Sequence, residues 1–232
     1  MAVITLSRQC NCNIREIVVK LADQLGYKIV DKEIIKYISI ISETPIEKIA
    51  AFDEEKHSNY RASMSKYFDF DVFTELMRSD LKQEQAEFNH YIEDNINSFE
   101  DIISDSTIVD SGSFKIMMEK IIRLVAQDNN VIIVGRGGQC ILKDVDNVLH
   151  VRFVSKIEDG VASVSKKENL NNEEARNKIV DINKRRKKFL KYYYKQNIED
   201  PLLYHIVINM SKFKMGEIVN AISDIIQLKG LN

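Results

Sequence analysis

The chain has few of the residues that interrupt regular structure, with two prolines and eight glycines among 232 residues. Because these residues mark turns and loops, their scarcity favours a helix-rich fold with short connections. Hydrophobic residues make up 44% of the chain, which is enough to bury a core and excludes a disordered polypeptide. The length suits one large domain, or one domain that carries an inserted subdomain.

Cysteine is also scarce. Cys10, Cys12 and Cys140 cannot all pair and none lies in a C-x-x-C, so a disulfide framework is excluded and reduced thiols in a cytosolic protein are predicted. The C-x-C spacing has no further Cys or His nearby, and we therefore predict no metal site on protein ligands. The histidines are scattered, and His150, inside an apolar run, is expected to be a hydrogen-bonded core residue.

The chain lacks both a long apolar run and a large net charge. No run approaches the ~20 residues of a membrane span, and no signal-peptide pattern is present, so we expect a cytoplasmic protein without a membrane partner. The net charge of −2 creates no global field for nucleic acid. Locally the charge is uneven: residues 47–110 hold 16 acidic and 6 basic residues, whereas residues 176–195 hold 9 basic residues and one acidic residue. We therefore expect the positive charge of residues 176–195 to have a local electrostatic role.

Short apolar runs alternate with amphipathic segments along most of the chain. Strands are predicted at 2–6, 27–30, 131–134, 148–154 and 204–208, and helices at 15–25, 32–41, 114–126, 173–195 and 215–228. Strands separated by helices indicate a mainly parallel sheet covered on both faces. The acidic, aromatic-rich residues 52–110 are interpreted as two or three helices that form a flap. No helix or strand is predicted in the polar stretch that follows residue 154.

The stretch Ser7–Glu16 connects the first predicted strand to the first predicted helix. A strand, a short polar turn and a helix are typical of a phosphate-binding unit, in which backbone N–H groups and the positive helix end meet an anion. Yet this turn contains no glycine, which a phosphate cradle normally requires. Against the spacing G-x-x-x-x-G-K-[ST], Gln9 and Ile14 stand at the glycine positions, Arg15 at the lysine and Glu16 at the hydroxyl residue.

In these elements and their order the chain resembles the cytidylate kinase-like family of P-loop nucleoside monophosphate kinases. The resemblance runs from Val3 to about Ile226, and the matching pieces lie at 4–9, 15–26, 31–35, 131–137, 148–151, 184–193 and 204–209. It implies a three-layer α/β P-loop fold with a parallel sheet of about five strands. The single domain would comprise a core (1–35, 113–154 and 201–232), an acceptor-side helical flap at about 36–112 and a basic lid at about 155–200.

The resemblance implies phosphoryl transfer from ATP to a pyrimidine nucleotide such as CMP, with ATP and Mg²⁺ as cofactors. Where the family's first loop has an aromatic residue and then Gly-Ser-Gly-Gly-Arg-Glu, this chain has Cys10 and then Asn11-Cys12-Asn13-Ile14-Arg15-Glu16. These six residues would hold the donor phosphates, and Arg15 would also act in catalysis. Because asparagine adopts the left-handed backbone readily, Asn11 and Asn13 are expected to keep a nest-like turn, whereas Ile14 at positive φ would be an outlier.

The resemblance also gives roles to four residues outside this loop. Arg136, which lies between glycines after an apolar strand, would bind the acceptor phosphate at the carboxyl edge of the sheet, or would only anchor that edge. Arg185 and Arg186 would neutralise the transferred phosphoryl group, since guanidiniums bind phosphate oxygens bidentately; a solvated helix face is the alternative. Asp31 would hold Mg²⁺ through water or orient the acceptor, or would only cap the next helix.

Two further positions depart from the family's pattern. Gly160 stands where an arginine is usual, and Asn183 stands where a lid aspartate is usual. Together with the missing loop glycines, they support a second hypothesis, a catalytically inactive family member that acts as a nucleotide-binding or protein-interaction module. Nucleic acid is not expected as a partner, although Tyr192, Tyr193 and Tyr194 lie among lysines, and homo-oligomerisation is left open.

Overall fold

The computed structural model describes residues 2–31, 33–41, 46, 49–50, 52, 111–127 and 130–230. The flap predicted at about 36–112 lies mostly outside these residues, so it remains a prediction. None of the helices in the described part of the chain combines the length and the apolarity that crossing a membrane requires.

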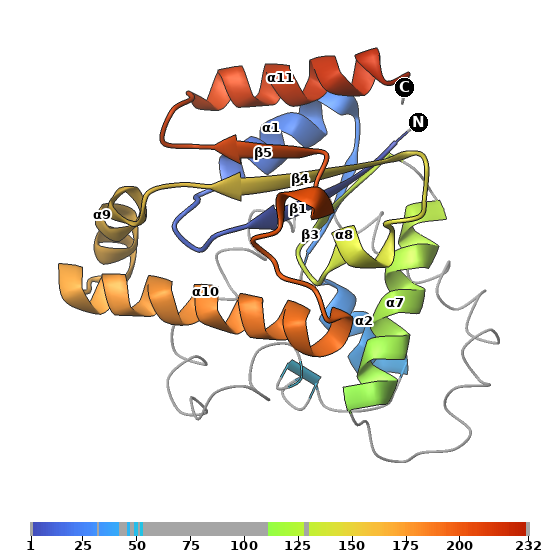
Figure 1. Cartoon of the computed structure of the whole chain (residues 1–232), viewed down its shortest axis with the longest axis horizontal. Coiled ribbons are helices and arrows are strands. Elements are labelled where there is room, and N and C mark those ends of the chain that lie inside the picture. Colours follow the sequence, from blue (N-terminus) through green and yellow to red (C-terminus); the bar gives the residue numbers. More distant parts are fainter. Residues whose placement is uncertain are drawn as a thin grey trace.

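Five parallel strands form the centre of the molecule, in the order β2-β3-β1-β4-β5 (Figure 1). They are β1 (Val3–Arg8), β2 (Lys28–Val30), β3 (Val131–Val134), β4 (Val148–Val154) and β5 (Ile206–Asn209). Since all the pairings are parallel, the carboxyl ends of the five strands lie at the same edge of the sheet. This topology confirms the predicted α/β class with about five parallel strands.

Helices cover both faces of the sheet (Figure 1). One face lies against α1 (Arg15–Leu25) and α11 (Met215–Leu228), and the other against α2 (Glu33–Ile41), α7 (Ser111–Gln127), α8 (Gly138–Ile141) and α10 (Asn172–Tyr194). Alternate residues of β1 serve the two faces: Ile4 and Leu6 pack with α1 and α11, while Val3 packs with the opposite core. The sheet is thus the middle of three layers.

The first strand is longer than the sequence predicts. Its apolar run ends at Leu6, but Ser7 and Arg8 continue the pairing with Arg152 and Phe153 of β4. A polar side chain at a strand end gives no apolar signal, which is why the prediction stopped early. The extension puts Arg8 at the carboxyl edge of the sheet.

The polar stretch after β4 contains a helix that the sequence analysis missed, α9 (Ile157–Glu168). It turns into α10 through Asn169 in the left-handed conformation (φ 53°) and a capping box, in which Asn171 accepts from the Glu174 N–H and Glu174 accepts from the Asn171 N–H. The two helices share a small core of their own, formed by Val161, Ala175 and Ile179, against which Cys10 is partly buried. The loop after β1 therefore lies against this helix pair.

Candidate functional site

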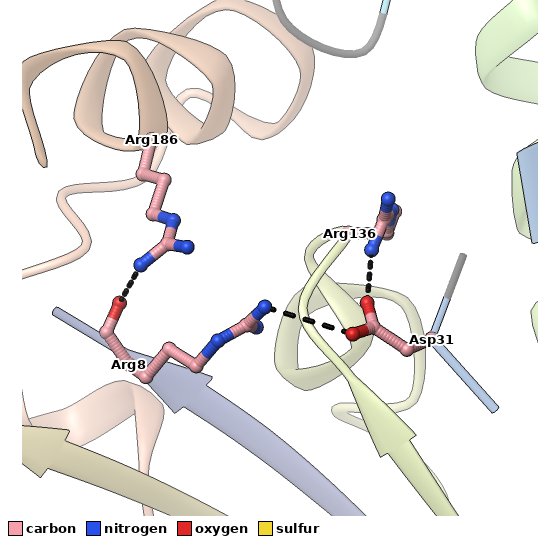
Figure 2. A network of polar contacts seen from close by, with 4 residues as sticks. All are labelled: Arg8, Asp31, Arg136 and Arg186. Carbon is pink, nitrogen blue, oxygen red and sulfur yellow. Dashed lines mark hydrogen bonds and ion pairs between the residues drawn. The ribbon is translucent and has the colours of Figure 1, made fainter. Parts of the chain in front are cut away.

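Four charged side chains meet at the carboxyl edge of the sheet, and we call them the arginine cluster (Figure 2). Arg8 ends β1, Asp31 follows β2, Arg136 follows β3, and Arg186 comes from α10. Arg136 Nη1 donates to Asp31 Oδ1 at 2.5 Å, and Arg8 Nη2 lies 3.7 Å from Asp31 Oδ2. Arg186 Nη1 donates to the Arg8 carbonyl oxygen at 3.0 Å. Two guanidiniums thus flank the Asp31 carboxylate, and a third is bonded to the backbone of Arg8.

The turn that carries Arg136 has an uncommon backbone. Gly135, Arg136 and Gly137 all have positive φ values, of 84°, 49° and 74°. A non-glycine residue in this region costs about 1–2 kcal/mol, and such strain concentrates at functional sites. Glycine is also required at both flanking positions by the side chains that pack against them. A Cβ on Gly135 would lie 3.3 Å from Arg8 Nη1, and one on Gly137 would lie 2.6 Å from the Tyr194 ring.

Arg186 is a half-buried cation at the edge of this cluster. Burial lowers its pKa to about 10, with a further contribution from the repulsion of Arg8, while Asp31 acts in the opposite direction. The group therefore stays protonated at neutral pH, although its charge is less well solvated than a surface arginine's. A bound anion would stabilise the charge of Arg186.

The loop after β1 does not form the predicted nest. Residues 9–14 contain no positive φ, and Ile14 is right-handed, with φ −88°. The expectation of left-handed Asn11 and Asn13, and of strain at Ile14, is therefore wrong. The physical reason is that Ile14, only 5% exposed, turns its side chain into the core beneath α1 and α11.

Backbone donors of this loop are bonded within the protein. The Cys12 N–H donates to the Gln9 carbonyl at 3.2 Å, and the Ile14 N–H donates to the Cys12 carbonyl at 3.0 Å. The Cys10 N–H donates to Asn183 Oδ1 at 2.7 Å. In this conformation these three N–H groups are not available to a phosphate.

Asn11 ties the loop to the start of α9 and to α10. Its Nδ2 donates to the Ser155 carbonyl at 2.8 Å and to the Ser155 hydroxyl at 2.7 Å, and its Oδ1 accepts from Asn183 Nδ2 at 3.2 Å. Gln9 adds a further bond, since its Oε1 accepts from the Ser155 N–H at 3.0 Å. Both the amide nitrogen and the amide oxygen of the buried Asn11 side chain are thus hydrogen-bonded within the protein.

Gly160 completes this contact, because α9 rests on the loop at that point. A Cβ on Gly160 would lie 2.4 Å from Asn11 Cβ and 2.5 Å from Asn11 Cα, which is closer than real atoms approach. Of the three departures from the family's pattern at these positions, Asn11 therefore contacts both of the others, Gly160 and Asn183. We call this group, with Gln9 and Ser155, the interlock.

The remaining predicted residues lie apart from the arginine cluster. Arg15 and Glu16 are exposed on the first turn of α1, and Asn13 is exposed just before them. Cys12 is buried in the core with α1 and α11, and that burial raises the pKa of its thiol. Arg185, 8% exposed, lies on α10 with its Nη2 3.5 Å from Asp181 Oδ2. The structure thus brings together Asp31, Arg136 and Arg186 from the predicted set.

Arg8 is the member of the cluster to which the sequence analysis gave no role. Its signal was present, since it stands between an apolar run and the polar loop, where a residue at the carboxyl end of a parallel strand would be expected. The apolar run alone did not show that the strand reached this residue.

A metal ion would need oxygen, nitrogen or sulfur ligands from side chains near the arginine cluster. Within the described ranges, no group of three or more His, Cys, Asp or Glu side chains could hold one. Mg²⁺ on a nucleotide needs only one or two carboxylates, but both oxygens of Asp31 face guanidiniums. As arranged here, Asp31 does not fit the role of a Mg²⁺ ligand.

His150 and the tyrosines of α10 lie outside the arginine cluster. His150 is buried, shares a 2.7 Å hydrogen bond with Thr5 and stacks on His205, which confirms the prediction of a hydrogen-bonded core histidine. Tyr193 lies in the core and the Tyr194 ring abuts Gly137, so the tyrosines of α10 form no exposed row on which bases could stack.

Comparison with known proteins gives a family and a fold. A sequence model described as the cytidylate kinase-like family matches residues 3–212. An uncharacterized protein from Eubacterium ventriosum ATCC 27560 has a similar structure, with a TM-score of 0.61 at 17% identity over 97% of this chain and 98% of that one. No curated protein matches the sequence.

Two shikimate kinases were also found among the solved structures. The enzyme from Bacteroides thetaiotaomicron has a TM-score of 0.49 at 10% identity, covering 97% of this chain and 98% of its own. The enzyme from Acinetobacter baumannii, in complex with shikimate, has a TM-score of 0.48 at 12% identity, covering 100% and 96%. Likenesses at this level support no argument about what the chain binds.

Proposed function

The chain belongs to the cytidylate kinase-like family, and from that premise we propose that it transfers a phosphoryl group from ATP to a pyrimidine nucleotide such as CMP. The observation that carries the proposal is the arginine cluster at the carboxyl edge of the sheet. Phosphoryl transfer depends on positioning and on neutralising phosphate charge, and guanidiniums supply both.

In this proposal Arg136 binds the acceptor phosphate. Its guanidinium lies at the sheet edge, 2.5 Å from Asp31, and each charge-assisted hydrogen bond to a phosphate oxygen contributes about 1.5–3 kcal/mol. Arg186, which keeps its charge at neutral pH, acts on the transferred group. The same role for Arg185 and the donor-phosphate role of Arg15 stay predictions.

The donor side requires a conformational change. For the loop amides to reach the phosphates of ATP, the interlock must open, which separates Asn11 from Ser155 and Asn183. Hydrogen bonds of this kind contribute about 0.5–1.5 kcal/mol each, so nucleotide binding could offset the opening. We expect transfer to be slow for this reason.

The interlock also favours a second candidate function, that of a catalytically inactive module that binds a nucleotide or a partner protein. A loop closed by its own side chains and by the glycine contact of α9 has given up the usual donor geometry. In this candidate the arginine cluster still binds a phosphorylated ligand. The free thiols of Cys10, Cys12 and Cys140 suit the cytoplasmic setting proposed for either function.

A coupled kinase assay separates the two candidates. The wild-type chain with MgATP and CMP, dCMP or UMP should show turnover, and Arg136→Gln should reduce kcat/KM at least about tenfold, because a charge-assisted contact is lost. Arg123→Gln, which changes an exposed arginine on α7, is the matched control and should leave turnover unchanged. Absence of turnover with every monophosphate at high enzyme concentration would overturn the transferase proposal in favour of the module.

A further inference from the structure

Two guanidiniums, those of Arg8 and Arg136, approach the carboxylate of Asp31, and a third, that of Arg186, lies at the backbone of Arg8. Figure 2 shows Arg8 and Arg136 directed at Asp31 from two sides and Arg186 extending from α10 to the Arg8 backbone. Arg186 is joined to the other three through its hydrogen bond to the Arg8 carbonyl, and the charge of Asp31 raises its pKa while that of Arg136 lowers it. The four groups therefore form one electrostatic unit.

The ion pairs that Asp31 makes with Arg136 and with Arg8 are unequal. Arg136 is held at 2.5 Å, whereas Arg8 stands off at 3.7 Å, beyond a normal hydrogen bond. The side chains of Arg8, Asp31 and Arg136 are 21%, 18% and 12% exposed, so solvent reaches the unit. An outside anion can thus compete for the Arg8 guanidinium at little cost.

Arg8 is fixed in position independently of Asp31. Its backbone is in β1, paired with Phe153, and its carbonyl accepts from Arg186. The absence of a side chain on Gly135 leaves room for its guanidinium, since a Cβ there would lie 3.3 Å from Arg8 Nη1. The strand end that carries the guanidinium is therefore held in place without Asp31, and Gly135 leaves room beside the guanidinium.

The chemistry of the unit suits a group with more charge than a carboxylate. A phosphate monoester carries about −1.5 to −2 near neutral pH and offers three acceptor oxygens, against one charge and two oxygens for Asp31. The guanidiniums of Arg8 and Arg136 already approach the two oxygens of one acid group, and bidentate forks are the usual geometry on phosphate.

We propose that Arg8 and Arg136, with the charge of Arg186 beside them, form one binding site for a phosphate monoester, and that Asp31 is an internal stand-in which the ligand displaces. The inference rests on the proposed function for the identity of the site and deepens it in two ways. It makes Arg8 a phosphate ligand, and it makes Asp31 a competitor of the substrate rather than a metal ligand or a residue that orients the acceptor.

The decisive variant is Asp31→Asn, which keeps the shape and removes the charge. Inorganic phosphate and CMP, titrated calorimetrically into the full chain at constant ionic strength, should bind about tenfold more tightly to this variant than to wild type, a difference of about 1.4 kcal/mol. A metal-holding or acceptor-orienting carboxylate predicts the reverse, namely unchanged phosphate affinity and weaker productive binding of CMP. Unchanged or weaker phosphate binding by Asp31→Asn would therefore overturn the inference.

Arg8→Gln provides an independent arm that does not rely on Asp31. Phosphate affinity should fall about tenfold or more, Arg8→Lys should recover part of it, and the control Arg123→Gln should match wild type. Unchanged affinity in Arg8→Gln would also overturn the inference, and this arm decides the question if Asp31→Asn does not fold.

These outcomes are distinct from those of the kinase assay. If no monophosphate is turned over but both arms behave as predicted, the site stands and the transferase proposal falls. If CMP is turned over while Asp31→Asn loses phosphate affinity, the transferase proposal stands and the stand-in role of Asp31 falls.

Discussion

At the scale of single residues, backbone direction decides which charged side chains reach the sheet edge. Arg185 and Arg186 are neighbours, but successive residues on a helix point about 100° apart. Arg186 therefore reaches β1, while Arg185 turns into the packing of α10. Both arginines have the same role in the sequence-based prediction, because the phase of α10 is set by tertiary packing.

Ile14 shows the same limit more sharply. Judged by its place in the sequence, Ile14 stands at a glycine position of a phosphate loop, and Ile14→Gly would be the natural variant for restoring that loop. In the structure it is a core residue beside α1, and truncation of a buried isoleucine costs about 2–5 kcal/mol. That variant would therefore report on stability rather than on nucleotide binding.

His150 gives a residue-scale prediction about pH. Burial, with a further contribution from His205, lowers its pKa from 6.5 to about 4. The folded state thus keeps His150 neutral while the unfolded chain takes up a proton, so its contribution to stability is present above pH 6.5 and is lost as the pH falls towards about 4. The loss should be roughly 2–3 kcal/mol.

Urea unfolding measured between pH 4 and pH 7 tests this expectation. His150→Gln should show a shallower decline of the unfolding free energy than wild type, because the glutamine does not titrate. His205→Gln removes the contribution of His205 to the lowered pKa of His150, so its decline should be shallower than that of wild type but steeper than that of His150→Gln. Parallel curves for wild type and His150→Gln would contradict the prediction.

At the scale of elements, the loop after β1 and the helix pair α9 and α10 act as one unit. The departures at Asn11, Gly160 and Asn183 look unrelated in the sequence, where they are separated by more than a hundred and by more than twenty residues. In space Asn11 joins the other two, since it fills the room above Gly160 and binds Asn183. The substitutions are coherent, which a pattern compared position by position could not show.

Gly160→Ala tests this packing directly. The added methyl would collide with the Cα and Cβ of Asn11, and backbone cannot move aside cheaply, so we expect a loss of about 1–3 kcal/mol in unfolding free energy. The matched control is Gly216→Ala in α11, where an added Cβ has no neighbour within 4 Å. That change should be neutral or should stabilise by up to about 1 kcal/mol.

Hydrogen exchange shows whether the loop shares the effect. Amides of residues 9–14 should exchange faster in Gly160→Ala than in wild type, while those of α11 should not change. Equal stability of the two alanine variants, or exchange that accelerates only within α9, would mean that α9 does not hold the loop.

At the scale of the whole molecule, the strand order creates the site. β2, β3 and β1 are adjacent in the sheet but distant in sequence, so their carboxyl ends bring Asp31, Arg136 and Arg8 together. Buried parallel strands appear in the sequence as apolar runs, which is why the sheet and the place of Arg136 could be predicted. The helix α11 could be predicted from its one-sided apolar pattern. The polar end of β1, the helix α9 and the loop conformation could not, because tertiary hydrogen bonds and packing determine them.

The most direct test of the account is the affinity for CMP compared with that for cytidine, measured by calorimetric titration into the wild-type chain and into Arg136→Gln. If the arginine cluster binds a nucleotide through its phosphate, CMP should bind to wild type, cytidine should bind far more weakly, and Arg136→Gln should lose about tenfold or more in CMP affinity. Equal affinities for CMP and cytidine, or CMP affinity that is unchanged in Arg136→Gln, would contradict the account.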